Sequence, residues 1–423
     1  MDMRIGKITP LLAGALCFVT VLSAAGDDWP QWRGPQRTGL SRETGLLKEW
    51  PKEGPKLVWQ MKDIGYGFGT PAIADGKIYL ISNRGPDNEF VAALDAKDGH
   101  QLWSTRIGKV GNPDQQPSYP GSRSTPTIDG DSLYVLGSDG DLACLDRATG
   151  KPRWQKSFRT DFGGQPGIWA YSESPLVDGD QVICMPGGSQ ATVVALNKKT
   201  GDTIWKSAVA GGEQAGYSSP TVVEIGGVRQ YIEVLQKGLA GIDAKTGKIL
   251  WRYDVTAKGS MANIPTPVYY DGLVYSAAGM TGGGLALIKA QQGSFEVEPK
   301  YFAKKLPNAI GGSVKLGDYL YGATNSTLMC VDFATGTPKW DNRALGAASV
   351  CAAEGMLYIH GENGEVALVE ATPEEYREKG RFKPADQPER NRTNAWAYPV
   401  ISNGKLYIRD LGSLWCYDIR STK

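Results

Sequence analysis

The chain has 423 residues, with 46 lysines and arginines against 45 aspartates and glutamates, and a formal net charge of +1. An even balance without a basic run disfavours nucleic acid or another polyanion as a partner. The only histidines, His100 and His360, lie in different parts of the chain. The sequence therefore gives no support for a histidine-based zinc site or catalytic triad.

The first residues have the features of a secretory signal. Arg4 and Lys7 precede an apolar run from Ile8 to Leu22, and small residues follow up to Ala25. We expect a signal peptide over residues 1–25, cleaved after Ala25, and a soluble exported chain in the periplasm or cell envelope. An uncleaved membrane anchor is the alternative, although polar and helix-breaking residues dilute the run. No later segment is apolar for long enough to span a bilayer.

The rest of the chain, residues 26–423, repeats one unit. Each copy has a short β-run, a turn with glycine and a second β-run, then an apolar strand, another turn and a fourth strand. Eight such hairpins are visible, from "PAIADGKIYLIS" at Pro71 to "PVISNGKLYIRD" at Pro399. Four antiparallel strands in roughly 45 to 50 residues are the span of one propeller blade. We therefore predict a single domain over residues 26–423.

The last two strands of most copies share a motif that ends in tryptophan. The first copy is "ALDAKDGHQLW", which ends at Trp103, and nearly the same sequence recurs in four later copies. The glycine supplies the left-handed residue that a short loop needs, and the tryptophan can lay a large apolar face against the neighbouring blade. Two copies, from Ala286 and from Ala367, lose the tryptophan. The predicted structural docking residues are Trp59, Trp103, Trp154, Trp205, Trp251 and Trp340.

The two ends of the chain complement each other. After the eighth hairpin, "SLWCYDIRSTK" provides a third strand and no fourth, whereas "PKLVWQMKD" around Trp59 is a fourth strand with no preceding three. We predict that this N-terminal strand completes the last blade, which closes the ring and removes two open sheet edges. The predicted fold class is an all-β, eight-bladed β-propeller, and we expect a monomer.

The repeated Ala-x-Asp-x-x-Thr-Gly-x-x-x-Trp sequence resembles the tryptophan-docking motif of the PQQ-type β-propellers. With the opening "WPQWRGPQRTGLS", from Trp29 to Ser41, the chain is similar to secreted PQQ-binding-like repeat proteins of planctomycete-type bacteria. Two branches share this fold. Quinoprotein alcohol dehydrogenases hold PQQ and Ca²⁺ in the funnel of the ring, and the BamB-like branch is a non-catalytic scaffold of outer-membrane protein assembly. Fold alone does not choose between them.

The loops that enter the innermost strands of a propeller line its funnel mouth. We predict a ligand- or partner-binding site there, because charged and aromatic residues stand in these loops while the core strands carry Val, Ile, Leu and Ala. The alternative is that Arg123 and Glu173, from neighbouring blades, only pair with each other and seal the channel. The predicted site residues are Arg123, Tyr171, Glu173, Tyr217, Asn263 and Trp396.

The dehydrogenase branch implies Ca²⁺, an aspartate base and partners for three carboxylates of the quinone. Glu173 and Asn263 are of the types that these enzymes use for Ca²⁺. The next loop, residues 306–313, has no aspartate, and the sequence has no adjacent cysteine pair to cover the quinone. We therefore predict no catalytic residue and no metal, and we disfavour PQQ with Ca²⁺ as a cofactor. The predicted function is binding of an envelope protein or a small polar ligand, with a PQQ-dependent alcohol dehydrogenase as the alternative.

Overall fold

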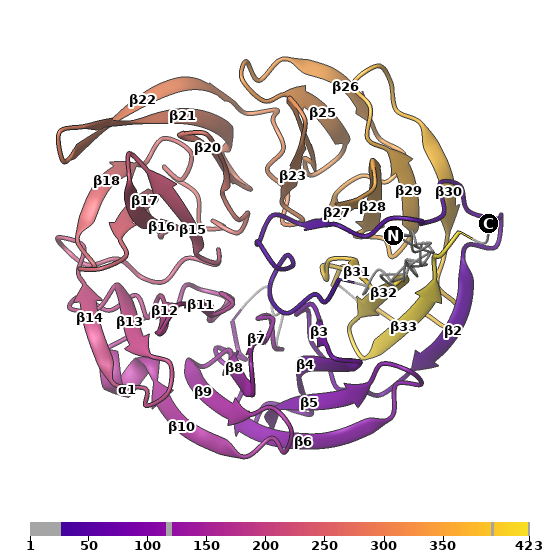
Figure 1. Cartoon of the computed structure of the whole chain (residues 1–423), viewed down its shortest axis with the longest axis horizontal. Coiled ribbons are helices and arrows are strands. Elements are labelled where there is room, and N and C mark those ends of the chain that lie inside the picture. Colours follow the sequence, from indigo (N-terminus) through magenta and orange to yellow (C-terminus); the bar gives the residue numbers. More distant parts are fainter. Residues whose placement is uncertain (1–26, 116–120, 391–392, 422–423) are drawn as a thin grey trace, which may run out of the picture.

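The computed structural model is a ring of eight β-sheets around one axis (Figure 1). It describes residues 27–115, 121–390 and 393–421, so the expected signal peptide at residues 1–25 lies outside the described residues. In the part of the chain described, no helix combines the length and the apolar composition needed to cross a membrane. The predicted all-β, eight-bladed fold is confirmed.

Each of blades 1 to 4 is one antiparallel sheet whose strands follow chain order from the axis outward (Figure 1). A short helix, α1 (Phe158–Phe162), follows blade 2. The strands are β3 (Ala72–Ala74), β4 (Lys77–Asn83), β5 (Glu89–Asp95) and β6 (Gln101–Gly108) in blade 1; β7 (Thr127–Asp129), β8 (Ser132–Leu136), β9 (Asp141–Asp146) and β10 (Pro152–Ser157) in blade 2; β11 (Leu176–Asp178), β12 (Gln181–Cys184), β13 (Val193–Asn197) and β14 (Thr203–Ser207) in blade 3; and β15 (Thr221–Ile225), β16 (Val228–Val234), β17 (Leu239–Asp243) and β18 (Ile249–Tyr253) in blade 4.

Blades 5 to 7 continue the pattern, and blade 8 takes its outer strand from the N-terminal part of the chain. The strands are β19 (Val268–Tyr270), β20 (Leu273–Ala278), β21 (Gly282–Gln291) and β22 (Ser294–Ala303) in blade 5; β23 (Ser313–Leu316), β24 (Tyr319–Ala323), β25 (Leu328–Asp332) and β26 (Pro338–Asn342) in blade 6; β27 (Ala348–Ala353), β28 (Met356–Gly361), β29 (Val366–Glu370) and β30 (Glu378–Phe382) in blade 7; and β31 (Val400–Ser402), β32 (Lys405–Asp410), β33 (Ser413–Asp418) and β2 (Lys56–Met61) in blade 8.

The N-terminal strand closes the ring. Strand β2 pairs with β33 in antiparallel register, so that Trp59 stands opposite Cys416. Closure therefore joins residues from opposite ends of the chain through backbone hydrogen bonds, as the incomplete first and last copies predict. Strand β2 therefore gives blade 8 its fourth strand and covers the edge of β33 that would otherwise be exposed.

Indole rings on the outermost strands dock most blades on the next. In four blades the indole N–H donates to a backbone carbonyl oxygen of the following blade, at distances from 2.7 to 3.2 Å. Such a ring contributes apolar area and a directed hydrogen bond to the same interface. The four pairs are Trp59 with Ala96, Trp154 with Lys198, Trp205 with Ala244, and Trp340 with Thr372.

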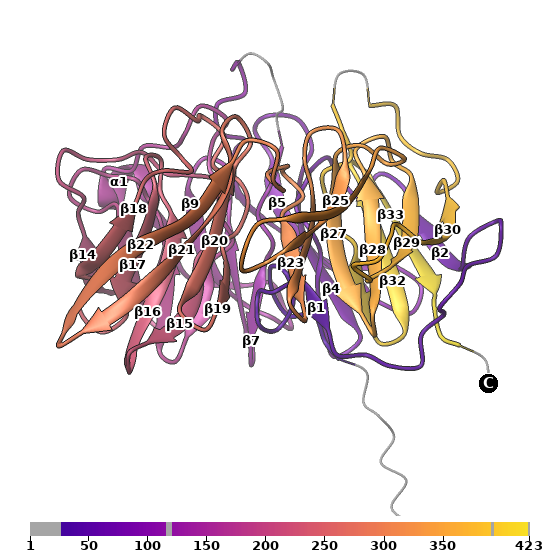
Figure 2. The ribbon, with the colours of Figure 1, turned by 90° about the horizontal axis from the view of Figure 1, so that it is seen from above.

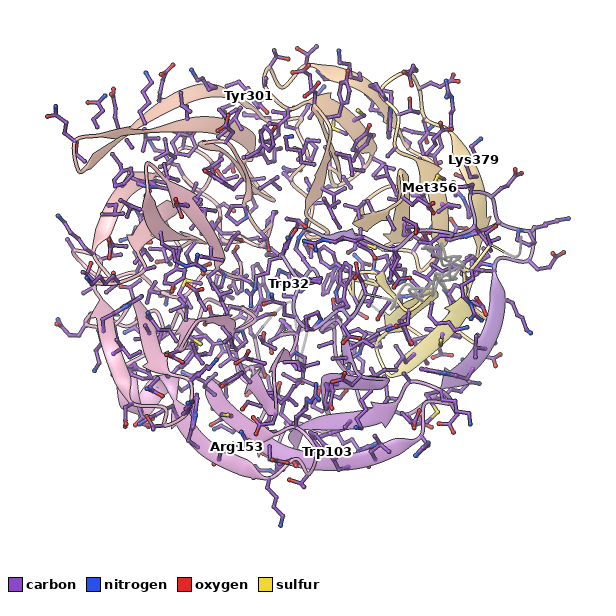
Figure 3. All side chains as sticks on the ribbon, in the orientation of Figure 1. Trp32, Trp103, Arg153, Tyr301, Met356 and Lys379 are labelled. Atoms are coloured by element: carbon purple, nitrogen blue, oxygen red, sulfur yellow. The ribbon has the colours of Figure 1, made fainter. Side chains whose placement is uncertain are left out.

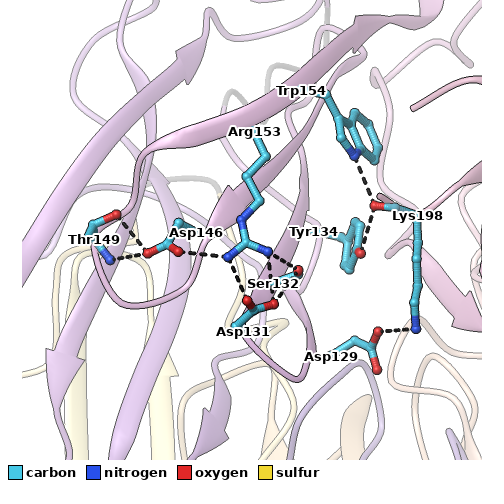
Figure 4. Close-up of polar contacts among 9 residues, drawn as sticks. All are labelled: Asp129, Asp131, Ser132, Tyr134, Asp146, Thr149, Arg153, Trp154 and Lys198. Carbon is cyan, nitrogen blue, oxygen red and sulfur yellow. Dashed lines mark hydrogen bonds and ion pairs between the residues drawn. The ribbon is translucent and has the colours of Figure 1, made fainter. Parts of the chain in front are cut away.

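Trp154 shows how the motif works in detail (Figure 4). Its indole N–H and the Tyr134 hydroxyl both donate to the Lys198 carbonyl oxygen, each at 3.0 Å. Asp146, earlier in the same motif, accepts from the backbone N–H and the hydroxyl of Thr149 at 2.9 and 2.8 Å. The aspartate and threonine of the motif therefore fix the turn within a blade, and the tryptophan joins that blade to its neighbour.

Two of the predicted docking tryptophans differ from these four in the hydrogen bond of the indole N–H. The Trp103 ring covers Gly150, where an added Cβ would come within 2.5 Å of it, but the indole N–H has no partner among the described residues. Trp251 donates to Gln230 of its own blade at 2.7 Å. The indole ring is therefore common to the six copies that carry the tryptophan, while its hydrogen bond varies.

The two copies without the tryptophan fill its position by other means. In blade 5, Tyr301 holds the same register position, and its hydroxyl donates to the Phe333 carbonyl oxygen at 2.8 Å. In blade 7 the position is Gly380, and Trp50, from the segment before β2, packs against it. The Trp50 ring also meets Phe382 at 5.5 Å between centroids. Both blade contacts therefore remain aromatic.

Candidate functional site

The N-terminal segment from Trp29 to Ser41 crosses the lower end of the central channel. Trp29 exchanges two backbone hydrogen bonds of 2.8 Å with Ile73 of blade 1. At its other end, β1 (Leu40–Ser41) adds to β27 of blade 7 as a parallel strand. The segment runs along the lower face in the side view, and Trp32 lies close to the ring axis (Figures 2 and 3). We call residues 29–41 the plug.

Two buried arginines fasten the plug. Arg37 donates to the carbonyl oxygens of Ser174 at 3.1 Å and Pro220 at 3.0 Å, and Arg33 donates to that of Ser313. Burial lowers the pKa of Arg37 to about 10, so its guanidinium remains charged at neutral pH. Charge-assisted bonds to several blades therefore hold the plug in the channel.

Above the plug lies an axial cavity of about 290 Å³, which we call the cup. Trp32 of the plug closes it from below: its indole N–H donates to the Thr266 hydroxyl at 2.9 Å, and its ring meets Tyr398 edge-on at 4.6 Å between centroids. The walls come from the loops that enter the innermost strands on the upper face. The lining residues are Trp32, Phe68, Arg123, Trp169, Ser172, Tyr217, Ser219, Ala262, Ile264, Ile310, Trp396 and Tyr398.

Aromatic rings from distant blades form most of the wall. Phe68 packs on Trp396 at 5.0 Å between centroids, and Trp169 packs on Tyr217 at 5.9 Å. The Tyr217 hydroxyl accepts from the Trp169 backbone N–H at 3.1 Å, which fixes the two loops relative to each other. The Trp169 indole N–H has no partner among the described residues. The cup is thus a rigid apolar surface with few polar groups.

Arg123 is the one charged side chain among the described residues that line the cup. It donates to the Gly121 carbonyl oxygen at 3.1 Å, and its guanidinium lies 5.8 Å from the Phe68 ring centroid. Burial lowers the pKa of Arg123 to about 10, against the opposing effect of the Glu89 carboxyl group. Burial likewise raises the pKa of Glu89 to about 7. Arg123 therefore keeps its charge at neutral pH.

Three of the six predicted site residues, Arg123, Tyr217 and Trp396, line the cup together. Tyr171 lies in the core of blades 2 and 3, where its hydroxyl donates to Pro186 at 2.9 Å. The residue before it, Ala170, has a φ of +77°. This left-handed residue separates Trp169, which lines the cup, from Tyr171, which packs into the core. Such backbone angles cost energy in a residue other than glycine and are found at functional sites.

Glu173 lies behind the wall of the cup. One carboxylate oxygen accepts from the Met185 backbone N–H at 2.6 Å. Burial raises the pKa of Glu173 to about 8 and that of the neighbouring Glu233 well above its ordinary value, while the Arg37 charge opposes both shifts. The carboxyl group whose charge acts on Arg123 is that of Glu89, and the guanidinium whose charge acts on Glu173 is that of Arg37. The positive charge that acts on Glu173 therefore comes from the plug, which no repeat position predicts.

Asn263 also supports the cup from outside its lining. Its side-chain amide donates to the carbonyl oxygens of Leu235 at 3.1 Å and Gln236 at 2.6 Å. Its own backbone carbonyl accepts from the Tyr217 N–H at 3.2 Å. These bonds tie the loop that supplies two lining residues, Ala262 and Ile264, to blade 4.

The predicted set omits several lining residues. Phe68, Trp169 and Tyr398 stand in the same class of loop as the predicted residues, so their loop position could have identified them. Trp32 belongs to the plug, which lies outside the repeats, and no repeat position predicts its path. The two tryptophans of "WPQWRGPQRTGLS" were the available signal, since such residues are usually covered in a folded protein.

The fold and the cup define a PQQ-type β-propeller with a blind axial cavity. The protein family described as "Outer membrane protein assembly factor BamB" matches residues 35–165 and 87–342, which together span more than half of the chain. The chain belongs to this family.

Individual relatives include both assembly factors and enzymes. Outer membrane protein assembly factor BamB of Burkholderia pseudomallei is 25% identical over 66% of this chain and 68% of its own length. Quinoprotein ethanol dehydrogenase of Pseudomonas aeruginosa is 32% identical over 44% of this chain. Tetrathionate hydrolase of Acidithiobacillus ferrooxidans is 23% identical over 53%. The chain matches only 24% of the ethanol dehydrogenase and 44% of the tetrathionate hydrolase.

Solved structures show the same fold at low sequence identity. BamB from Moraxella catarrhalis superposes with a TM-score of 0.61 at 16% identity, covering 86% of this chain and 99% of that one. A europium-containing methanol dehydrogenase superposes with a TM-score of 0.66 at 12% identity, covering 90% and 89%. Both branches therefore share the propeller, and the chemistry of the cup has to distinguish them.

Proposed function

We propose that this protein is a non-catalytic binding propeller of the cell envelope, which holds an envelope protein against its upper face. The observation that carries the proposal is the cup, which is closed below by Trp32 and lined by rings from several blades. A rigid concave apolar surface with few convergent polar groups is typical of a binding site. The match to BamB over two thirds of both chains supports the same function.

The composition of the cup favours binding over acid–base chemistry. A hydrolytic or proton-transferring site needs a general base or nucleophile within reach of the substrate. The described lining offers one guanidinium, two serine hydroxyls and two phenols, and no carboxylate or imidazole. The Tyr398 hydroxyl donates to the Ile310 carbonyl oxygen at 2.8 Å, and burial raises its pKa to about 12, so it stays protonated at neutral pH and does not serve as a base.

The lining does not fit a calcium-bound quinone. Ca²⁺ takes six to eight oxygen ligands, largely carboxylates and carbonyls. In the described residues no group of three or more His, Cys, Asp and Glu side chains is arranged to hold a metal ion. Glu173 and Asn263, the residue types that the dehydrogenases use, are not among the described lining residues, and one oxygen of Glu173 is bound to a backbone N–H. We therefore propose that the protein acts without PQQ.

Site-directed photo-crosslinking in the native host tests the proposal. Met280 on the upper face is 60% exposed, and Tyr270 on the lower face is 55% exposed, which makes them a matched pair. A photoreactive residue at position 280 is expected to form crosslinks to envelope proteins, and the same residue at position 270 is not. Equal yields at both positions, or no crosslinks from position 280, would contradict the proposal.

Spectroscopy tests the enzymatic alternative. Mature protein mixed with PQQ and Ca²⁺ and then passed over a desalting column is expected to emerge without quinone absorbance. Retained absorbance in a one-to-one ratio, together with dye reduction by an alcohol, would overturn the non-catalytic function.

A further inference from the structure

Apolar side chains are exposed around the mouth of the cup. Ile168 and Met261 directly precede two lining residues and are 36% and 53% exposed, and Met280 is 60% exposed. The loop of Met280 adjoins the cup, because the Gly279 N–H donates to the Ala262 carbonyl oxygen at 3.2 Å. Single exposed apolar residues are ordinary, but a set of them beside a cavity marks an interaction site. We call Ile168, Met261 and Met280 the apolar rim.

The size of the cup limits what can occupy it. Sites for drug-sized ligands usually enclose about 300 to 1,000 Å³, and the cup encloses about 290 Å³ above a closed floor. It therefore holds one large side chain or one small ring compound. A small compound confined to the cup would leave the apolar rim exposed to water, whereas a polypeptide that passes over the mouth covers both.

The charge of the cup limits the occupant further. Arg123 is the one charged residue among the described lining residues, and none of them is a carboxylate that could receive a lysine or arginine. An acidic group beside the anchor can pair with the guanidinium in a site that excludes water, where such bonds are strong and geometrically specific. A basic group at the same place would face a like charge.

We propose that the cup and the apolar rim bind an extended segment of a partner protein, which inserts one large apolar side chain into the cup and places a neighbouring aspartate or glutamate against Arg123. This inference rests on the proposed function and adds the chemistry of the partner. Aromatic walls favour an aromatic anchor, since ring pairs add to the energy of area burial. A buried anchor within a covered rim is the usual arrangement of an interface hot spot.

Selection from a random peptide library displayed on phage tests the inference with the full mature protein as the target. The selected sequences are expected to share a large apolar residue beside an acidic one. The variant Ala262→Trp, which places an indole in the cup, is expected to lower enrichment at least tenfold. Tyr270→Trp introduces the same side chain at an exposed position of the lower face, outside the cup and the apolar rim, and is expected to retain enrichment.

A double-mutant cycle on the best peptide then tests the ion pair. Fluorescence anisotropy is expected to show binding at least tenfold weaker when the peptide's acidic residue becomes its amide, and the same loss with Arg123→Gln. Combining the two changes should weaken binding by less than a further twofold, because each change alone already removes the same interaction. The peptide change requires no altered protein, so the test holds even if Arg123→Gln folds poorly.

Other outcomes would overturn the inference. The first three are a consensus sequence with a basic residue, enrichment that is unchanged by Ala262→Trp, and no enrichment at all. The fourth is displacement of every selected peptide by a free aromatic acid at equal concentration, which would assign the cup to a small molecule. Crosslinking from position 280 is independent of these results. If it captures envelope proteins while the library yields nothing, the chemistry assigned to the partner is wrong and the binding function stands.

Discussion

Replacing Gly247 with alanine measures how strongly one blade is docked on the next. Gly247 lies in the turn of blade 4, with a φ of +73°, and an added Cβ would lie 2.4 Å from the Trp205 ring of blade 3. Gly259 has a φ of +82° and nothing within 4 Å of an added Cβ. The two substitutions therefore share the backbone strain, and only Gly247→Ala adds the clash with the indole.

The expected free energies follow from these two contributions. A left-handed backbone costs an alanine about 1 to 2 kcal/mol, and overpacking a tight contact costs about 1 to 3 kcal/mol. Gly259→Ala should thus lower the free energy of unfolding by about 1 to 2 kcal/mol, and Gly247→Ala by about 2 to 5 kcal/mol. Trp205→Ala alone should cost about 3 to 5 kcal/mol, because it removes a buried aromatic ring.

Urea unfolding followed by circular dichroism provides the assay, with all variants compared at the same temperature and pH. In the Trp205→Ala background, the effect of Gly247→Ala should fall to that of Gly259→Ala, because the ring that it meets is absent. If Gly247→Ala costs the same in both backgrounds, the Trp205 ring does not lie on that turn and the assigned docking is wrong. An unchanged midpoint for Trp205→Ala would refute its burial at the interface.

The remaining predictions concern the plug and a buried acid. Deleting residues 26–60 removes the plug and all of β2 except Met61, so the purified chain should lose cooperative unfolding and aggregate; a stable monomer would place ring closure elsewhere. Arg37→Ala should lower the free energy of unfolding by about 2 to 4 kcal/mol, since it leaves several buried carbonyl oxygens without their donor, and an unchanged urea midpoint would show that the plug is dispensable. Glu89 has a pKa of about 7 in the folded protein against an ordinary value of 4.5. The folded state therefore binds more protons between these values, and stability should fall as pH rises from about 4.5 to 7. Glu89→Gln should flatten that fall and stabilise the protein at pH 8 by about 1 to 3 kcal/mol; an identical pH profile would contradict the assignment.

The ring was predictable from the sequence because its signals are local and repeated. Turn glycines, the motif aspartates and the tryptophans recur in register, and the unmatched strand around Trp59 indicates closure. The substitutes for the missing tryptophans were harder to predict. Tyr301 occupies the motif position itself, but Trp50 reaches Gly380 from a segment far away in the sequence. A contact made between such distant segments has no local pattern.

The candidate site was only partly predictable, for the same physical reason. Loop position identifies which residues approach the axis, and Arg123, Tyr217 and Trp396 reach the cup. It does not give the direction of each side chain, which depends on backbone angles such as the φ of +77° at Ala170. The plug lies outside the repeats, so a repeat position predicts neither Trp32 as the floor of the cup nor the effect of the Arg37 charge on the buried acids.

Crosslinking in a variant with a filled cup tests whether the partner protein binds at the cup. A photoreactive residue at position 280 would be combined with either Ala262→Trp, which fills the cup, or Tyr270→Trp, which alters only the lower face. The yield of crosslinked envelope protein would be measured in the native host. The proposed function predicts that Ala262→Trp abolishes the crosslinks while Tyr270→Trp preserves them, with both proteins shown to be folded by circular dichroism. Equal yields from the two variants would show that partners do not bind at the cup, and would contradict the proposed function.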